Sequence, residues 1–464
     1  MKRFIRPLLC ATALIAMLCV PSFAAGTAVP ISAPVTTGTA GNPAVLINGE
    51  AASFTDAAPK IMSGRTYIPF RAIFTALGFA DDAILWDAET RTVTAENEDV
   101  LISMTIGETK VNVTRDGATT SFETDAAPLV DSSSNRTYVP VRFVAEAMDY
   151  RVGWDSTNYV VIIDDVAAIL AANTETYELM DAYLEYNNQY SVGKWSAAGA
   201  YTMEMGIAGE KLAVNGDYTM LTENLALEFE TAMSFSGILD GTDVSTVIPT
   251  VNFTMLGDLE SGALYFQSKE LLKMMEMTPT DAWLKLDMAA LLDSMSATTG
   301  LTYAGLMTDA TASNASFADQ VATMLETLSL ESASFTTSDM LALINSMYGD
   351  SAFTQNGSDY TSQIDMDGVV ISIAFTTSNG AVTGYKMAIA MDVDGVAMDM
   401  TMSMSGANMD MSMYMSVSSA VDGVVYETYI DMTMDGTYTS TSSSPATKPP
   451  AGATVIDLMG LLGA

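Results

Sequence analysis

The sequence contains no histidine, and its only two cysteines, Cys10 and Cys19, lie close to the N-terminus. Without imidazole there is no Ser-His-Asp or Cys-His nucleophile system and no histidine general base. Zinc, haem and copper-imidazole sites also lack their usual ligands. These absences exclude most familiar hydrolases and redox enzymes, so we expect a protein that is not an enzyme and that carries no cofactor.

Basic residues are also scarce. The chain has 19 Lys and Arg against 56 Asp and Glu, a formal net charge of -37. Such a surface repels nucleic acid and anionic lipid head groups, so we expect no nucleic-acid partner. The hydrophobic content of 49% argues against a disordered acidic chain and indicates a folded protein with an acidic surface.

The N-terminus has the pattern of a secretory signal peptide. Lys2, Arg3 and Arg6 precede an apolar run over 8–20, and Ser22-Phe23-Ala24 is a small-x-small cleavage site. We expect residues 1–24 to be removed together with both cysteines, which leaves an exported protein without disulfides. The apolar run is too short for a stable membrane span, so we expect none in the mature chain. Residues 25–43 are expected to form a flexible leader.

One stretch of the sequence occurs twice, as an internal repeat. The first copy, over 65–95, begins RTYIPFR, and the second, over 136–163, begins RTYVPVR; the match extends upstream to 53–59 and 121–128. A self-match at a fixed period indicates a duplicated supersecondary unit. Each copy reads as strands, one helix and strands, with Asn48-Gly49 as a hairpin turn. We expect this module over residues 44–164.

These repeated residues resemble the copper amine oxidase N-terminal-like domain. The resemblance is carried by GRTYIPFR at 64–71, ALG at 76–78, WD at 86–87 and TRTV at 90–93, with the matching second set. It implies a stalk or surface module of secreted proteins in Gram-positive bacteria, with no catalytic residue to transfer, because copper and the quinone belong to a separate domain that needs histidine. The module signature consists of Arg65, Pro69, Arg71, Trp86, Arg136, Pro140, Arg142 and Trp154.

The signature arginines and tryptophans each allow two interpretations. The guanidinium groups could clamp an anionic wall polymer. Alternatively, each pairs with an Asp or Glu of its own repeat, such as Asp56, Asp87, Asp125 or Asp155. The tryptophans could stack on sugars or fill a core. We expect the arginines to form ion pairs and the tryptophans to be core residues.

Beyond the module, methionine becomes frequent, and we expect a second domain over 165–438. A helical run covers 166–190. Period-two strands are predicted over 200–207, 210–218, 225–235 and 251–256, and helices over 268–277, 282–295, 317–328 and 338–348. Six more strands follow, with Gly-containing turns at 367–368, 379–380, 394–395, 406–408, 422–423 and 435–436. Asn215-Gly216 is a further hairpin cue.

The predicted fold class is α+β, with the duplicated module followed by a curved antiparallel sheet packed on helices. The order of strands, helices and strands is similar to the half-barrel of lipoprotein-carrier proteins, in pattern only. Residues 439–464 are expected to be a Ser/Thr/Pro linker and an apolar tail too short to span a bilayer.

Methionine alternates along two neighbouring predicted strands. Period two places all eight sulfurs on one face, from Met398, Met400, Met402, Met404, Met409, Met411, Met413 and Met415. The face is expected to be a core or an apolar groove, with Met400, Met402, Met411 and Met413 as groove residues. Because thioethers suit Cu(I), the same eight residues are also a candidate copper site.

Other motifs give weaker indications. Asp365-x-Asp367-Gly368 and Asp392-x-Asp394-Gly395 lack the remaining ligands of a calcium loop and are expected to be turns. Ser191-x-x-Lys194 lacks the partner motifs of penicillin-binding proteins.

We therefore expect a non-catalytic, secreted protein of the cell surface or wall, whose stalk-type module attaches or positions a domain that binds a hydrophobic ligand or partner. Cell-wall polymer and envelope proteins are the other possible partners. The alternatives are an exported Cu(I)-binding protein and a carboxylate-based envelope hydrolase, although no two acids stand out as a catalytic pair.

Overall fold

A computed structural model describes residues 36–458 and 460, apart from 208–209, 240, 300–302, 304–314, 329, 331, 367, 394–395 and 422–423. The expected signal peptide, most of the leader, and the turns at 394–395 and 422–423 lie outside these residues. The chain divides into two compact units. The first, called the repeat unit, runs to Glu175 and includes Ala318–Asn345. The second, called the sheet unit, contains Thr176–Phe317 and the chain from Ser346.

The repeat unit follows the predicted duplication. Its elements are β1 (Ala44–Ile47), β2 (Glu50–Ala51), β3 (Lys60–Met62), β4 (Arg65–Pro69), α2 (Phe70–Ala76), η1 (Asp81–Ala83), β5 (Ile84–Asp87), β6 (Thr92–Glu96), β7 (Leu101–Thr105), β8 (Lys110–Arg115), β9 (Ala118–Glu123), β10 (Leu129–Asp131), β11 (Arg136–Pro140), α3 (Val141–Ala147), β12 (Arg151–Asp155), β13 (Val160–Asp164) and α4 (Val166–Ala172), followed later by most of α9 (Phe317–Thr327) and α10 (Thr337–Tyr348).

The two copies meet at their signature strands. β4 and β11 pair antiparallel, with Val139 opposite Ile68, in a sheet ordered β10-β11-β4-β3. β1 closes the module by pairing in parallel with β13. The strands β5 to β9 form a separate meander, of which β7 to β9 were not predicted.

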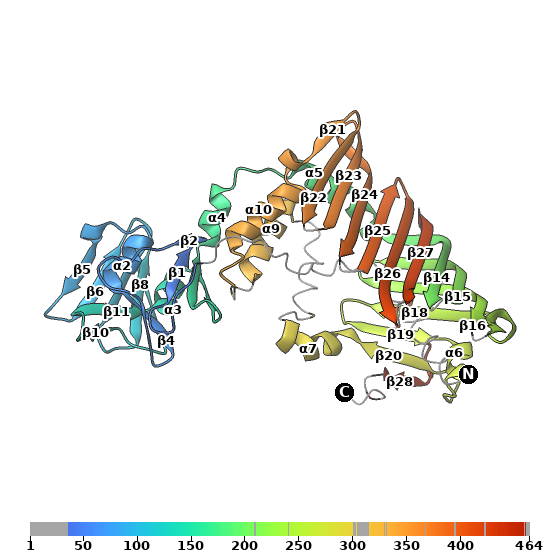
Figure 1. Cartoon of the computed structure of the whole chain (residues 1–464), viewed down its shortest axis with the longest axis horizontal. Coiled ribbons are helices and arrows are strands. Elements are labelled where there is room, and N and C mark those ends of the chain that lie inside the picture. The colour runs from blue at the N-terminus through green and yellow to red at the C-terminus, as the bar shows by residue number, and fades with distance from the viewer. Residues whose placement is uncertain are drawn as a thin grey trace. The chain divides into compact units, whose positions relative to one another are not determined.

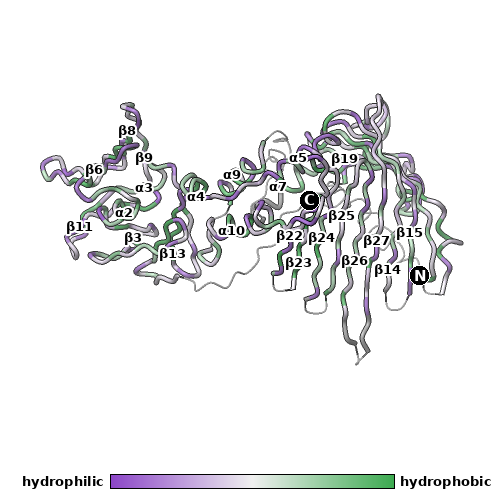
Figure 2. Tube along the Cα trace, turned by 90° about the horizontal axis from the view of Figure 1, so that it is seen from above, coloured by the Kyte–Doolittle hydropathy of each residue, from purple (hydrophilic) through white to green (hydrophobic). Residues whose placement is uncertain are grey.

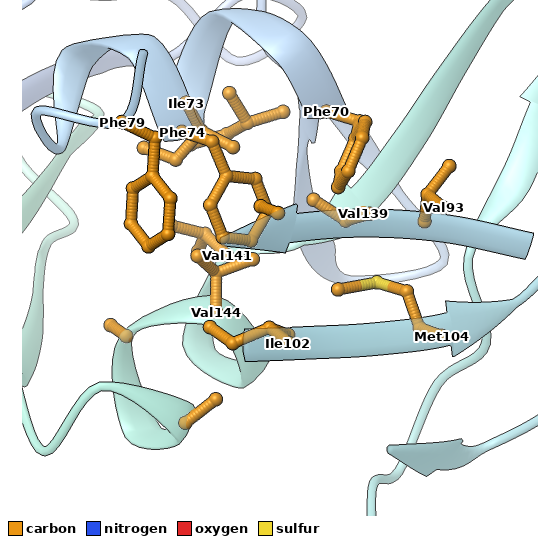
Figure 3. Packing of buried hydrophobic residues seen from close by; sticks show 14 of the residues in the cluster. Phe70, Ile73, Phe74, Phe79, Val93, Ile102, Met104, Val139, Val141 and Val144 are labelled. Carbon is orange, nitrogen blue, oxygen red and sulfur yellow. The ribbon is translucent and has the colours of Figure 1, made fainter. Parts of the chain in front are cut away.

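Helices α2 and α3 bury the apolar residues that recur at helical spacing. Phe70, Ile73 and Phe74 of α2 are almost fully buried, and Phe74 meets the ring of Phe79 edge-on. Figure 3 shows them packed with Val141 and Val144 of α3. The chain leaves the end of α2 through Gly78, whose φ is 90°. Residues with a side chain rarely adopt this conformation, which explains why a glycine stands at this position. The core of the repeat unit therefore joins both copies.

The sheet unit is built on one very large sheet. Its elements are α5 (Glu178–Ser191), β14 (Lys194–Ile207), β15 (Glu210–Glu223), β16 (Ala226–Leu239), β17 (Thr242–Asp243), η2 (Val244–Thr246), β18 (Val251–Asp258), β19 (Ala263–Gln267), α6 (Lys269–Met274), β20 (Trp283–Asp287), α7 (Met288–Thr299), η3 (Asp350–Ala352), β21 (Thr354–Asn356), β22 (Asp359–Met366), β23 (Val369–Ser378), β24 (Ala381–Val393), β25 (Val396–Ser405), β26 (Asn408–Val421), β27 (Val424–Ser440) and β28 (Val455–Asp457).

The 15 strands of this sheet join both predicted strand sections. The order is β21-β22-β23-β24-β25-β26-β27-β14-β15-β16-β18-β19-β20-β28, with β17 beside β16. Pairing of β27 with β14 makes the sections continuous, and Figures 1 and 2 show the long strands lying side by side. The sheet curves, so that β19 and β20 run across the direction of β23 and β24 (Figure 1). The fold is thus mixed α+β and consists mostly of strands.

Two predicted turns are wrong. Asn215-Gly216 lies inside β15 and Asp435-Gly436 inside β27, and both segments continue their ladders. A tyrosine side chain lies over each glycine: a Cβ at Gly216 would fall 2.6 Å from Tyr201 Oη, and one at Gly436 would fall 2.1 Å from Tyr218 Oη. These glycines make room for tyrosine rings and do not reverse the chain.

Four other predictions about element and domain limits also differ from the structure. The expected helix over 282–295 begins as β20, and the helical run over 166–190 is broken between α4 and α5. Residues 318–345, predicted within the second domain, belong to the repeat unit. The tail after 439 adds β28, which pairs in parallel with β20. Periodicity does not reveal these tertiary contacts.

Candidate functional site

The methionines of β25 and β26 are paired directly across the two strands. Met400 lies opposite Met413 and Met402 opposite Met411, and the outer pairs follow the same register. The pattern continues over the neighbouring strands. We call the result the methionine face; its two central rows are Ile371, Ile389, Met400, Met413, Met432, Met203, Val214 and Phe235, and Ile373, Met387, Met402, Met411, Met434, Tyr201, Gly216 and Met233.

The opposite face of these strands is polar, as period two requires. Asp399 lies opposite Tyr414, and Thr401 opposite Ser412. Thr202 and Thr433 hydroxyls are hydrogen-bonded across β14 and β27 at 2.8 Å. The predicted alternation is therefore present, and one sheet carries an apolar side and a polar, acidic side.

Burial varies along the methionine face. Met203 and Met432 are buried, at 2% and 4% exposed, whereas Met415 is 37% exposed. The four predicted groove residues, Met400, Met402, Met411 and Met413, are all partly exposed, as are Met398 and Met409. The described part of the chain thus covers the β14 side of the face more completely than the β25 and β26 side.

Helix α5 closes one end of the face with aromatic side chains. Tyr183 packs against Phe375 of β23 and Tyr385 of β24, with ring centroids 5.4 and 5.0 Å apart. The hydroxyls of Tyr186 and Tyr190 both donate to the Gly406 carbonyl, at 2.6 and 2.8 Å. Burial raises the pKa of Tyr183 to about 12.

Toward β14 to β20 the same face is a filled core. Phe253 and Phe266 lie 6.0 Å apart by ring centroid, and Leu271 of α6 packs against this cluster. The partly exposed methionines therefore lie between two closed regions of one sheet.

Three of the four signature arginines, Arg65, Arg71 and Arg136, form ion pairs, and two of these pairs join the two copies. Arg65 contacts Asp125 at 2.9 Å, and Arg136 contacts Asp56 at 2.6 Å. The expectation of pairing within each repeat is wrong for these two, because β4 and β11 lie side by side. Arg71 does pair within its own copy, with Asp81 at 2.9 Å.

The other two predicted aspartate partners and the remaining signature residues have other surroundings. Asp87 accepts hydrogen bonds from Thr90, and Asp155 accepts from Asn158 and from Ala333 N. Arg142 is exposed on α3. Pro69 and Pro140 are buried where β4 and β11 end.

The two signature tryptophans differ, and the expectation of a core position is wrong for Trp86. It lies on β5, the edge strand of its sheet, and is 44% exposed. Trp154 is partly buried against the core of the repeat unit, with its ring 6.3 Å from that of Tyr159. Trp86 and Trp154 occupy equivalent positions of the repeat, so nothing in the sequence indicated that Trp86 lies on an edge strand and is exposed.

The weaker motifs have local roles. The Gly368 amide donates to Asp365 Oδ1 at 3.4 Å, as in a turn, while Asp367 and the Asp394 loop fall outside the described residues. Lys194 begins β14, where its ammonium donates to Ser444 Oγ and lies 3.7 Å from Glu223. Within the described ranges, no group of three or more Asp, Glu, His or Cys could hold a metal ion.

Residues 46–177 match the family of the copper amine oxidase N-terminal domain. The repeat unit carries a copper amine oxidase N-terminal domain. The match extends beyond the predicted end at 164 and takes in α4. The domain covers the duplicated strands, and the sheet unit lies outside it apart from the first residues after Glu175.

Two solved structures are remotely similar in shape. One is the crystal structure of Rv2717c from M. tuberculosis, with 6% identity, 55% of this chain and 96% of that chain covered, and a TM-score of 0.15. The other is a DUF1329 family protein from Desulfovibrio piger ATCC 29098, with 10% identity, 55% and 91% covered, and a TM-score of 0.19. No curated protein matches the chain. None of the described helices is long and apolar enough to cross a bilayer.

Proposed function

We propose that the protein is a non-catalytic binding protein of the cell envelope, exported and held at the surface or wall, whose methionine face binds an acyl chain. The repeat unit serves as the attachment or positioning module, a role in keeping with its copper amine oxidase N-terminal domain. The observation that carries the ligand proposal is the run of partly exposed methionines between two closed ends of one apolar face.

The chemistry of methionine suits such a ligand. The side chain is unbranched, flexible and polarisable, so a row of methionines adapts to a guest without a fixed shape. The β25 and β26 rows also lie next to Ile371 and Ile389, which extend the apolar surface beyond the sulfurs. A long hydrocarbon could therefore lie across several strands and remove this surface from water.

A fluorescent fatty acid titrated into the delipidated full chain tests the proposal. The variant Met400→Gln with Met413→Gln keeps side-chain length but adds polar groups, and we expect it to weaken uptake about tenfold or more, because two amides covered by the bound acyl chain would lack partners. Ser412→Gln, on the opposite face of the same strand, is the matched control and is expected to bind as the parent does. Failure of the parent protein to take up acyl probes would overturn the proposal.

A second candidate function is Cu(I) binding. It is favoured by the register, which places a methionine of β25 opposite a methionine of β26 in four successive pairs. Replacing one central pair by leucine separates the two functions, since leucine keeps the apolar surface and removes two of the thioether ligands. Under the acyl proposal, Met400→Leu with Met413→Leu retains fatty-acid uptake. Under the copper alternative, the same variant loses Cu(I) affinity measured under reducing conditions. The carboxylate-hydrolase alternative has no pair of acids singled out in its favour.

A further inference from the structure

A groove of about 1120 Å³ opens in the repeat unit between the two copies of the duplicated sequence. The first copy contributes Leu85 and Trp86 from β5 and Arg71 from α2. The second copy contributes Val130 from β10 and Arg136 from β11. The groove is distinct from the methionine face and lies wholly within the copper amine oxidase N-terminal domain.

Three large apolar side chains of this groove are exposed. Leu85 is 58% exposed, Trp86 44% and Val130 42%. Exposed single hydrophobic residues are ordinary, but three that line one groove, one of them tryptophan, form a contact surface for a ligand.

The second copy is covered where the first is open. By the repeat, Leu85 corresponds to Gly153, and Leu330 lies so close to that glycine that a Cβ there would be 1.9 Å from the Leu330 carbonyl oxygen. The neighbouring Arg151 donates to the Leu325 carbonyl at 2.6 Å. The C-terminal end of α9 and Leu330 therefore pack on the second copy, whereas among the described residues the edge strand of the first copy keeps its apolar side chains exposed.

Fixed polar groups lie beside these apolar residues. Arg71 donates to the Asp81 carboxylate at 2.9 Å and to the Ile84 carbonyl at 2.8 Å. Arg136 donates to both oxygens of Asp56, at 2.6 and 3.0 Å. A guanidinium has five donors and a carboxylate about four acceptor positions, so each pair can make further hydrogen bonds without breaking its own.

The charges of the groove nearly cancel. Its lining includes the two arginines, their partners Asp56 and Asp81, and Glu50. A polyanion would need an excess of cations, which these pairings remove. The groove thus presents aromatic and aliphatic surface with paired, balanced donors and acceptors, which suits an uncharged polyhydroxylated ligand.

We propose that this groove binds an uncharged oligosaccharide. The C–H face of a sugar ring packs on the Trp86 indole, and the ring hydroxyls bond to the Arg71–Asp81 and Arg136–Asp56 pairs. The proposal deepens the attachment role proposed above for the repeat unit by giving it a ligand class, and it does not depend on the methionine face.

Calorimetric titration of the full chain with tetra-N-acetylchitotetraose tests it. We expect saturable binding that Trp86→Ala weakens about tenfold or more, since an aromatic anchor in a groove carries a large share of binding free energy. Trp86→Tyr, which keeps a stacking ring, is expected to recover part of the affinity. Tyr159→Asn changes an exposed aromatic of the same unit outside the groove and is the matched control, with unchanged binding.

A second variant distinguishes loss of binding from loss of folding. Arg136→Met keeps much of the aliphatic stem and removes the hydrogen-bonding fork, and it too should weaken binding while the thermal transition of the repeat unit remains. Fatty-acid uptake measured on the same variants should be unaffected, so loss of one activity is separable from loss of the other. The inference is overturned if the neutral tetrasaccharide does not bind at about 1 mM, if an anionic hyaluronan tetrasaccharide binds more tightly, or if Trp86→Ala binds as well as the parent.

Discussion

Arg136 and Asp56, 80 residues apart in the sequence, form a two-point ion pair that joins the two copies of the repeat. Arg65 and Asp125 form the reciprocal pair at 2.9 Å. The same exchange occurs between tyrosines and backbone carbonyls: Tyr67 Oη donates to Ala127 O, and Tyr138 Oη donates to Ala58 O. Each copy thus completes the other, so neither is expected to fold alone.

Tyr138→Phe is expected to destabilise the repeat unit by about 1–2 kcal/mol, because it leaves the Ala58 carbonyl without its donor. Tyr138 is fully buried, and its bond measures 2.9 Å. Tyr67→Phe removes the equivalent but longer bond of 3.3 Å and should cost less. Urea unfolding of the two variants measures the difference. Equal losses would show that the two copies are energetically equivalent despite their different hydrogen-bond lengths.

The Arg136–Asp56 pair should contribute a pH-dependent and salt-dependent increment of stability. The hydrogen bond from Arg136 lowers the pKa of Asp56. A lowered folded-state pKa means that the contribution is present above the unfolded pKa of about 4 and is lost as the pH falls through the folded value. The gap in urea midpoint between the parent and Arg136→Ala should therefore narrow below about pH 4 and also at high salt, because both groups are exposed. A gap that widens in acid would contradict this assignment.

The sequence predicts the helices and the first hairpin of the repeat unit well, because apolar residues at helical spacing and turn residues determine local structure. Phe70, Ile73 and Phe74 have helical spacing, and Asn48-Gly49 is the hairpin turn that was expected. The exposure of Trp86 was not predictable in the same way. It depends on β5 being an edge strand, a property of the sheet order and not of the residues on either side.

In the sheet unit, period two correctly assigns the faces of β25 and β26 but not the limits of every strand. Gly216 and Gly436 look like turn residues, yet they lie beneath the rings of Tyr201 on β14 and Tyr218 on β15. The pairing of β27 with β14, which makes one sheet of two sections, joins residues more than 200 positions apart. Such contacts leave no local pattern, so neither the single sheet nor the burial of particular methionines follows from the sequence.

Asp164 should make the repeat unit more stable in mild acid than at neutral pH. It is fully buried, Thr337 donates to one of its oxygens at 2.5 Å, and the other oxygen has no partner in the described structure. Burial raises the pKa of Asp164, against which the Thr337 hydrogen bond acts. A raised folded-state pKa means that the folded protein holds the proton more tightly, so stability increases as the pH falls from the folded value to the unfolded one near 4.

Asp164→Asn tests this directly, since it removes the titration and should flatten the dependence of the urea midpoint on pH above the unfolded pKa of about 4. Asp125→Asn, at an exposed ion pair, is the control and should leave the acid-side increase in place. An unchanged pH profile in Asp164→Asn would assign the effect to another group.

Methionines of one face should differ in their contribution to stability according to burial. Met203→Ala is expected to cost about 2–4 kcal/mol, because the side chain is 2% exposed and the core around it cannot fully collapse. Met415→Ala, at 37% exposed on the same face, should cost less than about 1 kcal/mol. Chemical denaturation of the sheet unit compares the two. Similar losses would mean that the β25 and β26 side is a closed core, which would also count against an acyl-binding face.

Removal of the two α5 tyrosine hydroxyls at the closed end of the methionine face should have non-additive effects on the free energy of unfolding. Tyr186 and Tyr190 donate to the same carbonyl, that of Gly406, so either hydroxyl alone still provides that acceptor with a partner. Tyr186→Phe and Tyr190→Phe should each change stability by less than about 0.5 kcal/mol, whereas the double variant should lose about 1 kcal/mol or more. Because α5 packs on β24, loosening it should also speed release of a bound acyl probe in stopped-flow displacement. Additive losses with an unchanged release rate would show that the two hydroxyls act independently and that α5 does not hold the ligand in place.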